Sequence, residues 1–196
     1  MGRTARIDRD MILDAALAIA DQHGLEAVTM AAIANRVGVT PMALYRHVAN
    51  KMAVLDGLVE RLLTEFPSPA SDAPWAERLG SLAGEIRAMA CRHPDVFPLL
   101  LQRPAITPEA LHVRGGIYRA LEEAGVDPER VARTERLIST AILGFATSEV
   151  SGRFSHHPPA ELDADFERLL EMLGQFIESE ANAAGVRDRQ PVSQPT

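Results

Sequence analysis

The chain has 196 residues, one cysteine and a formal net charge of −7. This length can bury a substantial core in one domain or in two small ones, and a lone cysteine excludes an intrachain disulfide. No apolar run is long enough to span a bilayer and the N-terminal residues lack the apolar core of a signal peptide, so we expect a globular, cytoplasmic protein with no membrane partner.

Four helices are predicted in the first third of the chain. The first runs from about residue 9 to residue 23, with Asp8 as its N-cap and Gly24 at its end. The second and third are short and lie between Thr29 and about Val48. The fourth runs from about residue 52 to residue 66, and its broad apolar stripe predicts that it packs on both sides.

The two short helices form the most informative segment, TMAAIANRVGVTPMALYRHVANK, at residues 29–51. Thr29 caps the first of them, and Gly38 suits the left-handed conformation that ends a helix. Thr40 and Pro41 are typical of the N-cap and first position of the second. A helix–turn–helix of this size fits the major groove of B-DNA.

The second short helix carries an unusual exposed face. Leu44 and Val48 are four residues apart and predict its inward side. Tyr45, Arg46 and His47 occupy other positions, where a purely structural helix would favour Glu, Gln or Lys. This face favours DNA binding, and an ordinary surface helix of an all-helical protein is the alternative.

Charge is distributed unevenly along the chain. Six basic and five acidic side chains leave residues 1–51 with a charge of +1, so the remainder carries −8. The basic groups of the first segment lie mainly in the N-terminal arm and around the second short helix, where both could meet one phosphate backbone.

Further helices follow a proline-rich break at residues 67–74, which is the predicted domain boundary. They are expected at about residues 75–92, from Thr107–Pro108 to Gly125, from Asp127–Pro128 to about Val150, and at about residues 160–180. Gly80 and Gly84 fall inside a helical pattern, where close packing or a kink is expected. The chain is predicted to be all-α, and residues 183–196 to be a disordered tail.

Residues 7–55 resemble the DNA-binding domain of the TetR/AcrR transcriptional regulators, especially the tetracycline repressor branch. The motifs that carry the resemblance are Ile12-Leu13-x-Ala15-Ala16, Gly24-Leu25, Val28-Thr29-Met30, Ile33-Ala34 and Val37-Gly38-Val39-x5-Leu44-Tyr45-x-His47-Val48-x-Asn50-Lys51. The C-terminal part is similar only through Trp75, the turn Arg92-His93-Pro94 and the segment Leu143-Gly144-Phe145.

The resemblance implies a bacterial, homodimeric repressor of transcription that binds a double-stranded operator. Residues 1–51 are then the DNA-binding domain, joined by helix 52–66 to an effector-binding and dimerisation domain at residues 67–182. Positions that usually contact phosphates are matched by Thr29, Tyr45, His47 and Lys51. Positions that usually face bases are matched by Thr40, Pro41, Met42, Ala43 and Arg46. Arg46 can contact either a guanine or a phosphate.

The resemblance also implies a pocket for a small-molecule effector, which the sequence does not identify. The candidate ligand-binding residues are Met89, His93, Phe97, Leu100, Tyr118 and Phe145, with Cys91 and His112 as further polar anchors. The alternative for most of them is a place in the core. Helices near residues 131–150 and 160–180 resemble the four-helix bundle through which such dimers form.

Other functions have weaker support in the sequence. No spacing typical of a metal site, catalytic nucleophile or phosphate-binding loop is present, so we expect no enzyme and no cofactor. A helical adaptor that does not bind DNA is the main alternative.

Overall fold

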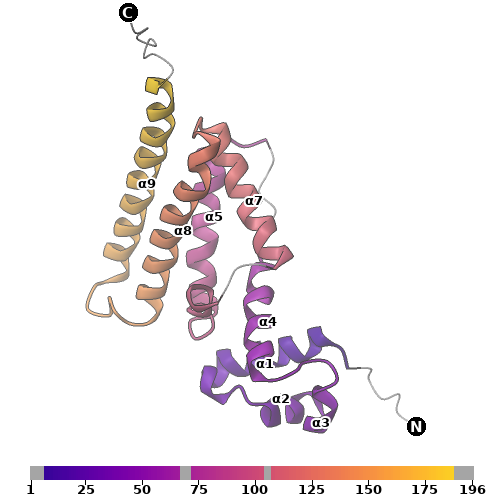
Figure 1. The fold of residues 1–196 in the computed structure, drawn as a ribbon. Helices are drawn as coiled ribbons and strands as arrows, with labels where there is room; N and C mark the ends of the chain where they lie inside the picture. Colours follow the sequence, from indigo (N-terminus) through magenta and orange to yellow (C-terminus); the bar gives the residue numbers. More distant parts are fainter. Residues whose placement is uncertain (1–6, 67–71, 104–106, 188–196) are drawn as a thin grey trace, which may run out of the picture. The chain divides into compact units, whose positions relative to one another are not determined.

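The computed structural model describes residues 7–66, 72–103 and 107–187 (Figure 1). This described part is all-α, as predicted from the sequence. It contains the 3-10 helix η1 (Leu25–Ala27) and nine α-helices, which are α1 (Arg9–His23), α2 (Met30–Val37), α3 (Pro41–Leu44), α4 (Lys51–Leu63), α5 (Trp75–Arg92), α6 (Leu99–Gln102), α7 (Pro108–Glu123), α8 (Pro128–Val150) and α9 (Pro159–Arg187). None of these helices is long and apolar enough to cross a membrane.

The chain divides into two compact units. The first unit comprises Met1–Pro67 and Ala88–Ala110, and the second comprises Ser68–Arg87 and Leu111–Thr196. The chain first passes between them within the proline-rich break at residues 67–74. Residues 88–110, which lie within the predicted C-terminal domain at residues 67–182, group with the first of these compact units.

Side-chain caps set the start of the helices in the first unit. Asp8 Oδ1 accepts from Met11 N at 2.9 Å, Thr29 Oγ1 from Ala32 N at 3.1 Å and Asn50 Oδ1 from Ala53 N at 3.0 Å. Each bond satisfies a backbone amide that has no partner inside the helix. Because Asn50 caps α4, that helix begins at Lys51, one residue before the predicted start.

Helices α1, α2 and α4 surround the core of the first unit. Its largest fully buried side chains include Ile12, Leu13, Ile33, Leu44, Leu58 and Leu62. Two ion pairs join α1 to α4 at the edge of this core, Arg61 Nε to Asp14 Oδ1 at 2.7 Å and Arg9 Nη2 to Glu60 Oε2 at 2.6 Å.

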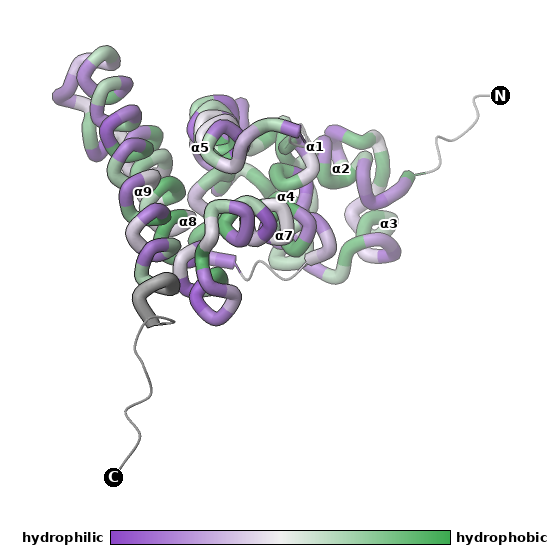
Figure 2. Tube along the Cα trace, turned by 90° about the horizontal axis from the view of Figure 1, so that it is seen from above, coloured by the Kyte–Doolittle hydropathy of each residue, from purple (hydrophilic) through white to green (hydrophobic). Residues whose placement is uncertain are grey.

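The second unit is built from α7, α8, α9 and the greater part of α5. Its core cluster comprises Ile117, Leu121, Val126, Val131, Ile138 and Ile177. Helices α8 and α9 lie side by side in Figure 1, and hydrophobic and hydrophilic residues alternate along both in Figure 2. They are therefore amphipathic, with one face in the core and another in solvent.

Three elements differ from their predicted form. Helix α3 ends at Leu44, and hydrogen-bonded turns continue it as far as His47. Helix α6, which begins in the apolar stretch at residues 96–101, is not among the predicted helices. Helix α9 continues to Arg187 instead of giving way to a tail at residue 183, where Ala183 and Ala184 favour helix. The rest of the predicted tail, residues 188–196, lies outside the described residues.

Candidate DNA-binding surface and ligand cavity

The helix–turn–helix is held in shape by its glycine and two apolar anchors. Gly38 has φ 79° and ψ 36°, a left-handed conformation that a side chain disfavours. Its N–H donates to carbonyls of α2, which closes that helix. In the next segment Leu44 is 0% exposed and Val48 is 4% exposed. Burial of these two side chains turns the other positions of the segment outward.

The predicted base-facing residues lie together on that outward side. Met42 is 73% exposed, Thr40, Pro41 and Arg46 are exposed, and Ala43 is half-buried. Among the described residues, the Arg46 side chain has no hydrogen bond or ion pair, so its five donors face solvent. Apolar contact and one guanidinium are the chemistry that this surface offers to base edges.

The predicted phosphate-facing residues surround this surface. Tyr45 is 49% exposed, His47 is exposed, and Lys51 is half-buried at the first position of α4. Thr29 is exposed at the N-cap of α2, where its Oγ1 accepts from Ala32 N. The hydroxyl proton of Thr29 is thus available to a phosphate oxygen. The predicted N-terminal arm, with Arg3 and Arg6, lies outside the described residues.

The six predicted ligand-binding residues are divided between the two units. Met89, His93, Phe97 and Leu100 belong to the first unit, whereas Tyr118 and Phe145 belong to the second. Met89 and Phe97 are both 0% exposed and form part of the hydrophobic core. Tyr118 packs against the core cluster of the second unit.

His93 and Phe145 are engaged with neighbouring side chains. His93 Nδ1 lies 3.0 Å from Asp21 Oδ1, and its Nε2 lies 3.4 Å from Glu65 Oε1. The imidazole therefore connects α1 to the chain after α4. Phe145 packs against the rings of Phe154 and Phe166, with centroid distances of 5.7 and 5.4 Å. The two further polar anchors, Cys91 and His112, are exposed.

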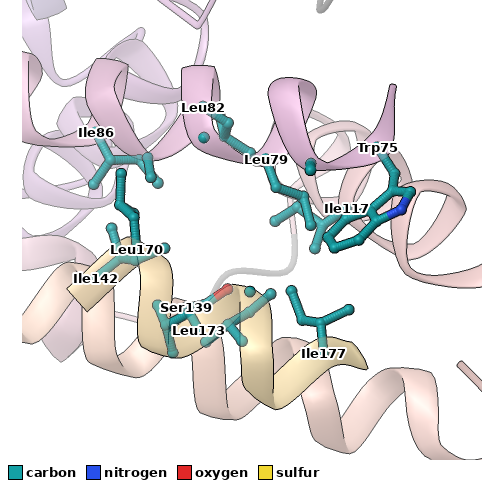
Figure 3. A pocket seen from close by; sticks show the side chains of 15 residues that line it. Trp75, Leu79, Leu82, Ile86, Ile117, Ser139, Ile142, Leu170, Leu173 and Ile177 are labelled. Carbon is teal, nitrogen blue, oxygen red and sulfur yellow. The ribbon is translucent and has the colours of Figure 1, made fainter. Parts of the chain in front are cut away.

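The second unit contains a cavity that the sequence analysis did not predict (Figure 3). Its volume is about 140 Å³. It is lined by Trp75, Ala76, Leu79, Gly80, Leu82, Ala83 and Ile86 of α5, Ile117 of α7, Ile138, Ser139 and Ile142 of α8, and Leu170, Leu173, Gly174 and Ile177 of α9. None of the six predicted ligand-binding residues is among them.

Two helical glycines were the signal in the sequence that could have indicated this cavity. Gly80 and Gly174 line it, and a Cβ atom built on either would meet nothing within 4 Å. The same holds for Gly84, so the close packing expected around Gly80 and Gly84 is not observed. The space beside Gly80 and Gly174 belongs to the cavity, whereas the space beside Gly84 does not.

Ser139, a polar side chain of the cavity wall, is held by a hydrogen bond to Glu135. Ser139 Oγ donates to Glu135 Oε1 at 3.0 Å, and Arg114 Nε lies 3.9 Å from the same oxygen. Glu135 is only 7% exposed. Elsewhere in the described ranges, no group of three or more His, Cys, Asp or Glu side chains could hold a metal ion.

Comparisons with known proteins cover nearly the whole chain. Residues 12–58 match the family model "Bacterial regulatory proteins, tetR family", and residues 67–184 match "Tetracyclin repressor-like, C-terminal domain". The HTH-type transcriptional repressor DrrR1 of Streptomyces coeruleorubidus is 30% identical over 174 residues, which cover 87% of this chain and 64% of that protein. The chain thus spans less than two thirds of the length of this relative.

Solved structures agree with the sequence relatives. ActR of Streptomyces coelicolor in complex with (S)-DNPA is 25% identical with a TM-score of 0.76, over 90% of this chain and 100% of that one. BioQ with its double-stranded DNA operator is 26% identical with a TM-score of 0.75, over 89% of this chain and 99% of that one. With both family models matched, this chain belongs to the tetR family of bacterial regulatory proteins and carries its tetracycline repressor-like C-terminal domain.

Proposed function

We propose that this protein is a homodimeric, sequence-specific repressor of transcription that a small molecule releases from a double-stranded DNA operator. The observation that carries this proposal is the outward face of residues 40–47, which presents Tyr45, Arg46 and His47 to solvent above the buried Leu44 and Val48. Two similar proteins support it, the repressor DrrR1 and BioQ in complex with its operator. The proposal is a cytoplasmic regulator and not an enzyme.

Phosphate and base contacts are divided between two sets of residues in this proposal. The Tyr45 hydroxyl, the His47 ring, the Lys51 ammonium and the Thr29 hydroxyl donate to phosphate oxygens and fix the position on the duplex. Sequence is read by Thr40, Pro41, Met42, Ala43 and Arg46. Met42 and Ala43 suit thymine methyl groups, and Arg46 suits a guanine or a phosphate.

Dimerisation is proposed to use the solvent faces of α8 and α9. Leu137 of α8 is 50% exposed and Met172 of α9 is 55% exposed. Large apolar side chains on two neighbouring helices are unfavourable in water, and a second copy that packs the same helices against them completes a four-helix bundle.

The effector is proposed to bind in the cavity between α5, α7, α8 and α9. The cavity is concave and mostly apolar with a polar group in its wall, which is the usual form of a small-molecule site. Binding there favours dimer conformations whose two recognition segments no longer match the spacing of the half-sites. Met89, His93, Phe97 and Leu100 are not needed as direct contacts in this scheme.

The test is binding of the full chain to the DNA upstream of its own gene, measured by fluorescence anisotropy against scrambled DNA of equal length. We expect specific binding by a dimer, weaker binding to both DNAs in Tyr45→Ala, and a reduced preference for the upstream DNA in Arg46→Ala. Arg119→Ala is the matched control, because Arg119 is exposed on α7. Equal affinity for the two DNAs at every salt concentration would contradict the proposal, and the absence of binding to either DNA would favour the helical adaptor.

A further inference from the structure

The chemistry of the cavity wall restricts what the cavity can hold. Only two side chains of the wall carry a polar atom, Ser139 and Trp75, and none carries a charge. A formal charge buried against such a wall loses its hydration without gaining a partner. The part of a molecule that lies inside this cavity is therefore uncharged and mostly apolar.

The hydrogen bond of Ser139 decides which polar group the molecule carries. A serine hydroxyl has one proton to donate and two lone pairs that accept. The Ser139 proton is directed to Glu135 Oε1 at 3.0 Å, and Arg114 balances the charge of that carboxylate. An ionised carboxylate only accepts, so Ser139 has lone pairs left for a ligand. In Figure 3 the Ser139 oxygen lies on the wall opposite Leu79 and Leu82.

The volume of the cavity indicates the size of the buried part. At about 140 Å³ it is close to an engineered protein cavity of about 150 Å³ that binds benzene. Gly80 and Gly174 leave open space where any other residue would place a Cβ atom. One substituted ring fits without a rearrangement of the helices.

We propose that the cavity binds an uncharged, largely apolar molecule that buries a ring and donates one hydrogen bond, from a hydroxyl or an N–H, to Ser139 Oγ. This proposal specifies the chemistry of the effector. That the bound molecule regulates DNA binding rests on the proposed function. Occupation of the cavity and release of DNA are measured separately, so either can fail without the other.

Trp75 makes occupation directly measurable, because it lines the cavity and is the only tryptophan of the chain. Tryptophan fluorescence of the full chain is titrated with thymol, with its methyl ether and with p-isopropylbenzoate, and calorimetry repeats each titration. We expect thymol to bind about five- to tenfold more tightly than its ether, as one neutral hydrogen bond predicts. We expect the carboxylate not to bind measurably.

Two substitutions test the hydrogen bond. Ser139→Ala removes the acceptor, so thymol and its ether should bind with affinities within about twofold of each other. Glu135→Gln supplies an amide that can donate to Ser139, which frees the hydroxyl proton and should likewise reduce the preference for thymol. Ser81→Ala is the control, because Ser81 is exposed on α5 and does not line the cavity.

A second pair of variants tests the location. Gly80→Ala places a methyl group in the cavity and should weaken thymol at least about tenfold, because overpacking a filled site is unfavourable. Gly84→Ala makes the same change on the same helix outside the cavity and should leave binding unchanged. Circular dichroism and thermal melting confirm that all variants fold.

Several results would overturn the proposal. These are equal affinity for thymol and its ether in the unmodified chain, tighter binding of the carboxylate, no binding of any probe up to its solubility, or thymol binding that Gly80→Ala leaves intact. If thymol binds as expected but operator affinity does not change, the cavity chemistry stands and the effector role assigned to the cavity fails. If the chain does not prefer its upstream DNA, the repressor proposal fails while the titrations remain valid.

Discussion

Gly57 and Gly84 are both glycines inside helices, but their surroundings differ. A Cβ atom on Gly57 of α4 would lie 2.5 Å from Leu13 Cδ2 and 3.1 Å from Arg9 Nη2, whereas one on Gly84 of α5 would meet nothing within 4 Å. Gly57 therefore allows α1 to approach α4 closely, and Gly84 has no such role. Sequence alone does not separate the two cases, because both glycines interrupt a helical pattern in the same way.

Alanine at these two positions should change stability in opposite directions. Gly57→Ala should lower the free energy of unfolding by about 1–2 kcal/mol, because overpacking of the Leu13 side chain outweighs the gain in helix propensity. Gly84→Ala should raise it by about 0.5–1 kcal/mol. Urea denaturation followed by circular dichroism measures both. A stabilised Gly57→Ala would show that Leu13 moves aside at little cost.

Lys51 is the residue whose proposed role is easiest to isolate, because its side chain contributes a point charge. Lys51→Ala should weaken binding to operator and scrambled DNA alike. It should reduce the slope of log affinity against log salt by about one, the value for one lost phosphate contact. Anisotropy titrations at several salt concentrations give this slope, with Arg119→Ala as the control. An unchanged slope removes Lys51 from the phosphate contacts.

At the scale of the elements, Arg87 joins three helices of the second unit. From α5 it bonds Glu149 of α8 through Nε at 2.7 Å and Nη2 at 2.5 Å, and its Nη1 lies 2.8 Å from Asp163 of α9. Its guanidinium carbon also lies 5.0 Å from the ring centroid of Phe166. The hydrogen bond to Glu149, with Asp163 nearby, raises the pKa of Arg87 above its ordinary value despite partial burial.

Loss of this connection should destabilise the second unit. Arg87→Ala should lower the free energy of unfolding by about 2–4 kcal/mol, because it leaves Glu149 without its partner at a site where the arginine side chain is 18% exposed. Because the pKa of Arg87 is raised above its ordinary value, its contribution is fully present at every pH below that ordinary value and is lost only as the pH rises through the higher pKa of the folded state. Chemical denaturation of the variant measures the loss.

Arg168→Ala is the matched control for Arg87. Arg168 pairs with Glu171 at 2.7 Å on the surface of α9, where both side chains are more than 60% exposed. Such a pair contributes little, so we expect a change below about 0.5 kcal/mol. A similar loss of stability in both variants would mean that burial does not increase the contribution of the Arg87 ion pairs to the free energy of unfolding.

At the scale of the whole molecule, the proposed repressor acts only as a dimer. Leu137→Glu combined with Met172→Glu places two charges on the proposed interface and should convert the protein to a monomer. Light scattering after size-exclusion chromatography measures the mass, and anisotropy should show a large loss of operator affinity because one half-site contact is gone. Leu111→Glu is the control, since Leu111 is similarly exposed at 55% on α7. A dimer in the double variant would exclude this interface.

Local signals were enough to predict most of the helices and the outward face of residues 40–47. The caps Asp8 and Thr29, the turn glycine Gly38 and the buried pair Leu44 and Val48 act over at most one or two helical turns, so a linear sequence contains them in full. The resemblance to the tetR family rests on this same segment. The end of α3 was harder to predict, because the chain after Leu44 continues as hydrogen-bonded turns, in which His47 N and Val48 N both donate to Leu44 O.

The sequence by itself therefore determined the all-α class, the family and the outward set of residues at 40–47. Only the tertiary structure decided where an apolar side chain lies in a core and where it lies beside a cavity. Met89 and Phe97 are of the residue types expected in a ligand site, but they are fully buried in the core. Leu79 and Ile86 have the spacing of an ordinary apolar helix face, but they line the cavity. The physical reason is that an unfilled volume arises between four helices distant in sequence, and no local pattern records the space that they leave.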